Sequence, residues 1–126
     1  MTYDLARAQA YFDAKIAFTT EPYELKARLD AGEPLHVVDV RFPADFRKGH
    51  VPGAVNFPKG KWEEPEAFLS KDKLNVLYCY NQACHKAAHA AALAVAKGYR
   101  VIEVEGGFDT WENAGYPVEA STVRAA

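Results

Sequence analysis

Residues 74–104, "LNVLYCYNQACHKAAHAAALAVAKGYRVIEV", have the pattern of a strand, a loop, a helix and a second strand. The segments 74–79 and 100–104 are short and mostly apolar, so both are expected to be buried strands. Between them, residues 86–98 are rich in alanine, the best helix former, and end at a glycine. Because two strands joined through a helix run parallel, this stretch predicts an α/β fold.

The rest of the chain continues this alternation. Apolar residues at helical spacing predict a helix over 3–17, and a second helix is expected in 19–32, where Thr20 can cap it and Pro22 suits its first turn. The further expected elements are a strand at 36–40, a loop rich in glycine and proline at 49–58 with a brief strand at 54–57, a short helix in 63–70, and a glycine turn followed by a short helix in 106–115. Helices on both faces of a mostly parallel sheet follow from this order.

Length and charge narrow the function classes. A chain of 126 residues fits one domain, and its formal charge of -2 gives no sign of a nucleic-acid or anionic-membrane partner. No apolar run approaches the roughly 20 residues of a membrane span, and the charged N-terminus has no signal-peptide core. We therefore expect a cytoplasmic protein. In a reducing compartment, two nearby cysteines indicate catalysis, redox chemistry or metal binding rather than a permanent disulfide.

Both cysteines fall in the loop between the first strand and the helix of the opening stretch. Cys79 closes the strand, and ligands of parallel sheets bind beyond the carboxyl ends of the strands. The positive end of the following helix dipole favours a thiolate there, so Cys79 is the candidate nucleophile. Three roles remain open for Cys84: a resolving thiol that attacks an oxidised Cys79, the reactive thiol itself, or a bystander.

Two longer stretches resemble a known family. Residues 37–58, "VVDVRFPADFRKGHVPGAVNFP", and residues 76–118, which include the strand, Cys79, the helix and "GGFDTW", are similar to the two halves of the rhodanese homology domain. The likeness extends over roughly 20–118. It implies an α/β domain with a central parallel sheet of four to five strands. The implied organisation is an N-terminal helical extension at 1–19, a rhodanese-like domain at 20–120 and a C-terminal tail at 121–126.

The resemblance also implies an activity. Single-domain members of this family are sulfurtransferases of the thiosulfate:cyanide type, in which a cysteine takes a sulfane sulfur from thiosulfate or a persulfide and passes it to a thiol or cyanide. No cofactor is expected. Carried over by position, Cys79 is the nucleophile, the loop and anion pocket comprise Tyr80, Asn81, Gln82, Ala83, His85 and Lys86 together with Cys84 as the second thiol, and Asp39 and Arg41 support the loops around the site.

The loop departs from the usual family pattern. It contains neither glycine nor arginine, is about two residues longer, and looks like a subgroup with a Cys-x4-Cys loop. Without an arginine fork, weak activity with the thiosulfate dianion is expected, and His85 or Lys86 are the candidates to supply positive charge. Alternatives are a dithiol redox module of Cys79 and Cys84, a non-catalytic binding domain, and zinc held by these cysteines with His85 and His89; we expect no metal.

The expected partners are a small-molecule sulfur donor and acceptor, with a protein as a further candidate acceptor, and neither nucleic acid nor membrane. The helix at 3–17 lies outside the family likeness, and its apolar stripe has to be buried against the domain or against a second copy. A homodimer through this helix is therefore a further hypothesis.

Overall fold

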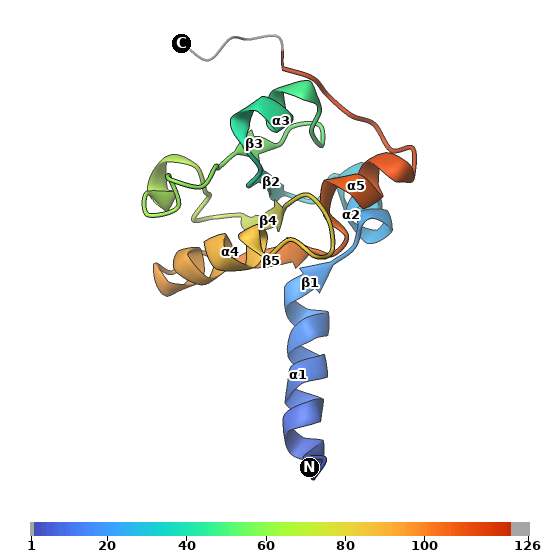
Figure 1. Cartoon of the computed structure of the whole chain (residues 1–126), viewed down its shortest axis with the longest axis vertical. Coiled ribbons are helices and arrows are strands. Elements are labelled where there is room, and N and C mark those ends of the chain that lie inside the picture. Colours follow the sequence, from blue (N-terminus) through green and yellow to red (C-terminus); the bar gives the residue numbers. More distant parts are fainter. Residues whose placement is uncertain (1, 122–126) are drawn as a thin grey trace.

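A five-stranded parallel sheet forms the centre of the chain in a computed structural model that describes residues 2–121 (Figure 1). The strands are β1 (Thr19–Thr20), β2 (Leu35–Asp39), β3 (Val55–Asn56), β4 (Leu74–Tyr78) and β5 (Val101–Val104), in the order β1-β5-β4-β2-β3. The central strand β4 places Val76 opposite Val37 of β2 and Ile102 of β5. The sequence prediction of a parallel sheet of four to five strands is confirmed.

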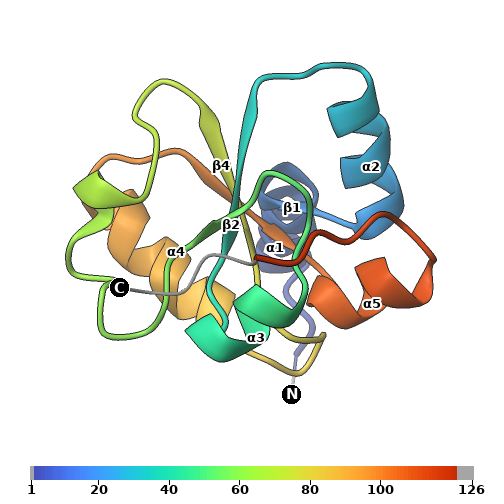
Figure 2. The ribbon, with the colours of Figure 1, turned by 90° about the horizontal axis from the view of Figure 1, so that it is seen from above.

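Helices cover both faces of this sheet, as predicted. The helices within residues 2–121 are α1 (Leu5–Phe18), α2 (Pro22–Asp30), α3 (Pro43–Lys48), α4 (Lys86–Ala96) and α5 (Gly107–Asn113), with one 3-10 turn at Pro65–Ala67. Figure 2 shows α4 on one side of the sheet and α2 and α5 on the other. The carboxyl ends of the strands lead into the loops before α3, α4 and α5.

Alternation along β4 divides the interior into two cores. Leu77 and Cys79 belong to the core under α4, whereas Val76 and Tyr78 belong to the core under α2 and α5. Successive side chains of a strand point to opposite faces, so a strand buried on both faces is expected to be mostly apolar. This explains why β4 has no polar face in the sequence; its buried Asn75 accepts from the Ser70 amide and donates to the carbonyls of Ser70 and Arg100.

Four local features differ from the sequence expectations. The short helix expected in 63–70 is only the three-residue 3-10 turn at Pro65–Ala67. Thr20 does not cap α2, because it lies in β1 and its hydroxyl donates to the Glu24 carboxylate at 3.0 Å. The cap is Glu21, whose carboxylate accepts from the amides of Tyr23 and Glu24. The two-residue strand β1 was not expected, because only its pairing with β5 makes it a strand. Helix α3 was not expected either, because its N-cap Phe42 offers no side-chain acceptor.

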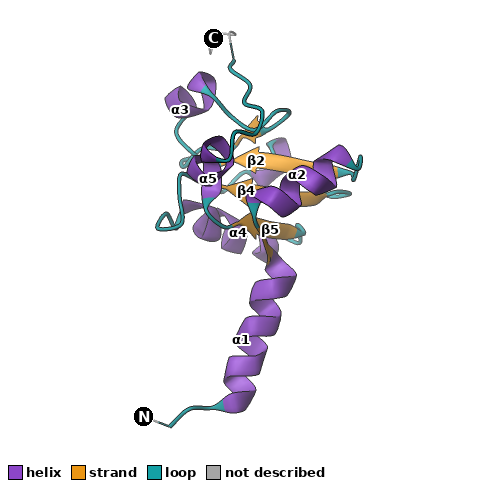
Figure 3. Cartoon of the chain, turned by 90° about the vertical axis from the view of Figure 1, so that its right-hand side faces the viewer, coloured by secondary structure: helices purple, strands orange, loops and turns teal. Residues whose placement is uncertain are grey.

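Helix α1 projects from the domain (Figures 1 and 3). The Asp4 carboxylate caps it by accepting from the Arg7 amide at 3.0 Å, yet none of its residues is buried, and Leu5 and Ile16 are 77% and 79% exposed. Its predicted apolar stripe therefore has no partner within residues 2–121. The tail predicted at 121–126 lies, apart from Ser121, outside the described residues.

No helix within residues 2–121 is long and apolar enough to span a membrane.

Candidate active site

Cys79 lines a pocket of about 230 Å³ at the carboxyl end of the sheet. It follows β4 directly and is 3% exposed, because its side chain belongs to the core under α4. The pocket is lined by loop residues, the first turn of α4 and the end of β5: Cys79, Asn81, Gln82, Cys84, His85, Ala87, Ala88, Glu103, Val104, Glu105 and Gly106. A strand end, a loop and a helix N-terminus therefore meet at one cysteine.

The two cysteines are joined by a disulfide. Their Cα atoms are 6.3 Å apart, inside the range of about 4.4–6.8 Å that a disulfide requires. The five-residue separation thus lets the loop bring both sulfur atoms together. A disulfide sulfur is not a thiolate, so Cys79 can act as a nucleophile only after this bond is reduced.

Hydrogen bonds fold the loop back on itself. The Ala83 amide donates to the Asn81 side-chain oxygen at 3.0 Å, and the Cys84 amide donates to the Asn81 carbonyl at 3.1 Å. Across the pocket, the Gly106 amide donates to the Gln82 side-chain oxygen at 2.6 Å. These bonds fix the turn between the two cysteines and tie it to the end of β5.

The start of α5 holds the loop from the other side. The amides of Phe108 and Asp109 donate to the carbonyls of Cys79 and Tyr80, each at 2.9 Å. Gly107 makes this approach feasible, because a Cβ there would lie 2.7 Å from the Cys79 carbonyl oxygen. Its φ of +59° is also a conformation that residues with a Cβ rarely adopt. The second half of the chain thus positions Cys79 through backbone contacts.

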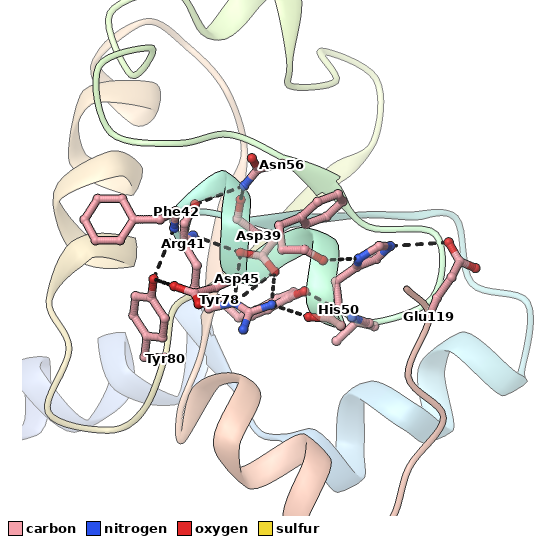
Figure 4. Close-up of polar contacts among 12 residues, drawn as sticks. Asp39, Arg41, Phe42, Asp45, His50, Asn56, Tyr78, Tyr80 and Glu119 are labelled. Atoms are coloured by element: carbon pink, nitrogen blue, oxygen red, sulfur yellow. Dashed lines mark hydrogen bonds and ion pairs between the residues drawn. The ribbon is translucent and has the colours of Figure 1, made fainter. Parts of the chain in front are cut away.

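The structure divides the predicted loop residues into two groups. Asn81, Gln82, Cys84 and His85 line the pocket, whereas Tyr80, Ala83 and Lys86 are not among its lining residues. The Tyr80 hydroxyl donates to Asp45 and accepts from the Phe42 amide at 3.2 Å (Figure 4), and burial together with Asp45 raises its pKa. The Lys86 ammonium lies 5.3 Å from the centre of the Phe42 ring. Of the two residues expected to supply positive charge, His85 lines the pocket and Lys86 does not.

Two carboxylates that the sequence interpretation missed form one wall of the pocket. Glu103 and Glu105 come from the end of β5, beside the strand that carries Cys79. Burial raises the pKa of Glu103, and the neighbouring Glu105 raises it further, while His85 and Lys15 act in the opposite direction. Adjacent parallel strands end at the same edge, so the position of β5 beside β4 was the signal that could have identified them.

The His, Cys, Asp and Glu side chains of residues 2–121 form no group of three or more that could hold a metal ion. While the disulfide is intact, neither cysteine can supply the thiolate ligand that zinc needs.

Comparison with known proteins places this geometry in a family. The family model of the rhodanese-like domain matches residues 21–114 of this sequence. The chain belongs to the rhodanese-like domain family. The match contains β2, β4 and β5, the loop with both cysteines and the whole of α5, so every element that builds the pocket lies within the family domain.

Relatives of this rhodanese-like domain differ in length. It is 30% identical to the putative sulfurtransferase YtwF of Bacillus subtilis over 74% of this chain and 88% of that protein. It is 32% identical to a sulfurtransferase of Allochromatium vinosum over 76% and 89%. A 36% identical relative, the HTH-type transcriptional regulator Rv0324 of Mycobacterium tuberculosis, is longer, and the match covers 76% of this chain and 42% of the regulator.

A similar solved structure extends the likeness beyond the family match. The BH2092 protein of Bacillus halodurans superposes with a TM-score of 0.83 and 32% identity, over 94% of this chain and 88% of that one. An overlap of 94% leaves about 8 of the 126 residues unaligned, and α1 alone has 14 residues, so part of α1 is included in the superposition. The likeness to this solved structure therefore reaches into the segment that precedes the family match.

Asp39 and Arg41 form a buried pair beneath the loops of this rhodanese-like domain (Figure 4). The Arg41 guanidinium donates to Asp39 at 2.8 Å and to the Gly49 carbonyl at 2.5 Å, and its central carbon lies 4.1 Å from the centre of the Phe108 ring. Burial alone would lower the pKa of Arg41, but the hydrogen bonds and charge of Asp39 raise it overall. The Phe108 amide in turn donates to the Cys79 carbonyl, so the pair of Asp39 and Arg41 supports the site through Phe108.

Proposed function

We propose that this rhodanese-like domain is a sulfurtransferase that carries a sulfane sulfur as a persulfide of Cys79. The observation that carries the proposal is the placement of Cys79 at the end of the central strand, in a pocket that opens before α4. Two relatives of similar length are named sulfurtransferases, which supports the same class of reaction. The sulfur comes from thiosulfate or a persulfide and passes to a thiol or to cyanide.

The N-terminus of α4 stabilises the anions of this reaction. The first amides of a helix have no acceptor within the helix, and the N-cap His85 offers none through its side chain. These groups and the helix dipole favour negative charge on sulfur at the pocket. A thiolate and a persulfide anion are therefore stabilised without a general base.

The charges around the pocket favour a persulfide donor over thiosulfate. Glu103 and Glu105 line the pocket, and the loop contains no arginine that could bind a dianion through two hydrogen bonds. A dianionic donor is repelled more strongly by carboxylates than a donor with a single charge. The proposed order of efficiency is therefore an alkyl persulfide before thiosulfate.

The test uses a Cys84→Ser variant, in which the disulfide cannot form. After reduction and removal of the reductant, incubation with thiosulfate or with glutathione persulfide should add the mass of one sulfur atom to the peptide that contains Cys79. Cyanide should remove this sulfur as thiocyanate. The matched control is the double variant that also carries Cys79→Ser, which should gain nothing. Sulfur that fails to load on Cys79, or that loads equally on the double variant, would overturn the proposal.

The disulfide supports a second candidate function, a dithiol oxidoreductase of Cys79 and Cys84. Such a protein would exchange its disulfide with thiol substrates without acquiring sulfur. The reduced wild type would then reduce a disulfide substrate such as insulin, while the Cys84→Ser variant would stay free of added sulfur under both donors. That pair of results would favour this candidate over sulfur transfer.

A further inference from the structure

The disulfide indicates what Cys84 can do once Cys79 carries sulfur. Both sulfur atoms belong to residues that line one pocket, and the loop brings them to bonding distance with their Cα atoms 6.3 Å apart. Cys79 is 3% exposed, whereas Cys84 is partly exposed. The thiol placed to reach the sulfur of Cys79 is therefore one from the same chain.

We propose that Cys84 resolves the Cys79 persulfide and releases its outer sulfur as sulfide; this inference rests on the proposed function. The Cys84 thiolate attacks the Sγ of Cys79, and the bond between the two Sγ atoms forms as the bond to the outer sulfur breaks. The outer sulfur leaves as HS⁻ with the electron pair of that bond. Two cysteines are oxidised to a disulfide, and one sulfane sulfur is reduced to sulfide.

This step balances without an external oxidant or reductant, and its protein product is the disulfide seen in the structure. A further turnover needs two electrons to reopen the disulfide, which a dithiol reductant supplies by thiol–disulfide exchange. The proton of the Cys84 thiol ends on the released sulfide or in solvent. Over a cycle, the protein consumes a sulfane sulfur and a dithiol and produces sulfide, which is a persulfide-reducing activity.

The pocket favours this internal acceptor over external ones. Thiolates and cyanide are anions, and on their way to Cys79 they meet the wall of Glu103 and Glu105. Cys84 belongs to the loop and does not have to enter, and a group held next to its target reacts at a high effective concentration. Hydrogen bonds that fix the turn at Asn81 keep Cys84 in place for the attack.

A single turnover distinguishes release from storage of sulfur. The fully reduced protein is freed of reductant under anaerobic conditions and mixed with excess thiosulfate, and free sulfide and intact mass are measured. The wild type should release about one sulfide per chain, lose two hydrogen atoms and retain no added sulfur. Cys84→Ser should retain one sulfur atom and release sulfide only when a thiol is added. Ala96→Ser, an exposed change at the last residue of α4 and away from the pocket, should behave as the wild type.

The outcomes separate the two proposals. If Cys84→Ser loads sulfur and the wild type also stores it without releasing sulfide, the resolving role of Cys84 is wrong and the sulfurtransferase proposal stands. If Cys84→Ser does not load sulfur although its thermal unfolding matches the wild type, both proposals fall. A Cys84→Ala variant repeats the measurement with no hydroxyl in the pocket, and sulfide release from it would also refute the resolving role.

Discussion

Replacing Gly107 by alanine adds one methyl group, yet it should loosen the loop between Cys79 and Cys84 considerably. The new Cβ would lie 2.7 Å from the Cys79 carbonyl oxygen and 2.9 Å from the Asn81 amide nitrogen. Both contacts are to backbone, which cannot rotate away as a side chain can. Ordinary contact begins near 3.4 Å, so the two segments must separate by about 0.7 Å, the difference between 3.4 and 2.7 Å.

The cost has two parts. A residue with a Cβ at a φ of +59° loses roughly 1–2 kcal/mol relative to glycine. Separation also stretches the 2.9 Å hydrogen bonds from Phe108 to Cys79 and from Asp109 to Tyr80. Each such bond contributes about 0.5–1.5 kcal/mol, so the total loss of unfolding free energy is about 2–5 kcal/mol.

Urea unfolding of the reduced proteins measures this loss, since reduction removes the disulfide from both states. Gly115→Ala is the matched control: its φ is +79°, but an added Cβ meets nothing within 4 Å, so only the cost of about 1–2 kcal/mol for the backbone conformation should appear. Sulfur loading of Cys79 should also slow in Gly107→Ala and not in the control. If both variants lose the same free energy, the close backbone approach at Gly107 does not hold the loop.

Three further predictions concern the buried pair, the acidic wall and the projecting helix. Asp39→Asn should lower the unfolding free energy by about 3–5 kcal/mol in urea titrations, because it leaves the buried charge of Arg41 unpaired; a loss below about 1 kcal/mol would contradict this. Burial raises the pKa of Glu103 in the folded state, so the folded protein holds this proton more tightly than the unfolded chain, and stability is lost as pH rises through the raised pKa. Glu103→Gln should therefore flatten this part of the curve of unfolding free energy against pH, and it should also lower the KM for thiosulfate. An unchanged curve and an unchanged KM would refute the role of this wall. If α1 pairs with a second copy, sedimentation should detect a dimer that Phe12→Ser with Ile16→Ser converts to a monomer, and a monomeric wild type would exclude the pairing.

The central elements could be predicted because their signals are local. Strands β2, β4 and β5 are short runs of mostly apolar residues, and α4 is an alanine-rich segment followed closely by a glycine, so each was predicted to within about two residues. The short edge strand β1 has no such run, since its two threonines become a strand only by pairing with Glu103 and Val104. Its existence is a property of the tertiary fold.

The site was predictable at the level of the cysteines and not at the level of the pocket wall. Strand, loop and helix predicted that Cys79 and Cys84 lie together beyond the sheet, and their Cα separation of 6.3 Å agrees. The direction of the Lys86 side chain toward Phe42 depends on where α3 lies, and α3 itself was not predicted. Glu103 and Glu105 needed the strand order, which places β5 next to β4.

The projecting helix makes the chain sensitive to limited proteolysis. A helix of 14 residues without tertiary packing is marginally stable in water, and Phe18 at its base is 62% exposed, so chymotrypsin can reach this position. Cleavage there removes Lys15, whose ammonium lies 2.7 Å from the Glu105 carboxylate at the pocket wall. The shortened product would keep the sheet and both cysteines but repel anions more strongly. A partly clipped preparation would therefore contain two enzymes with different donor preferences, and mass analysis of each batch would distinguish them.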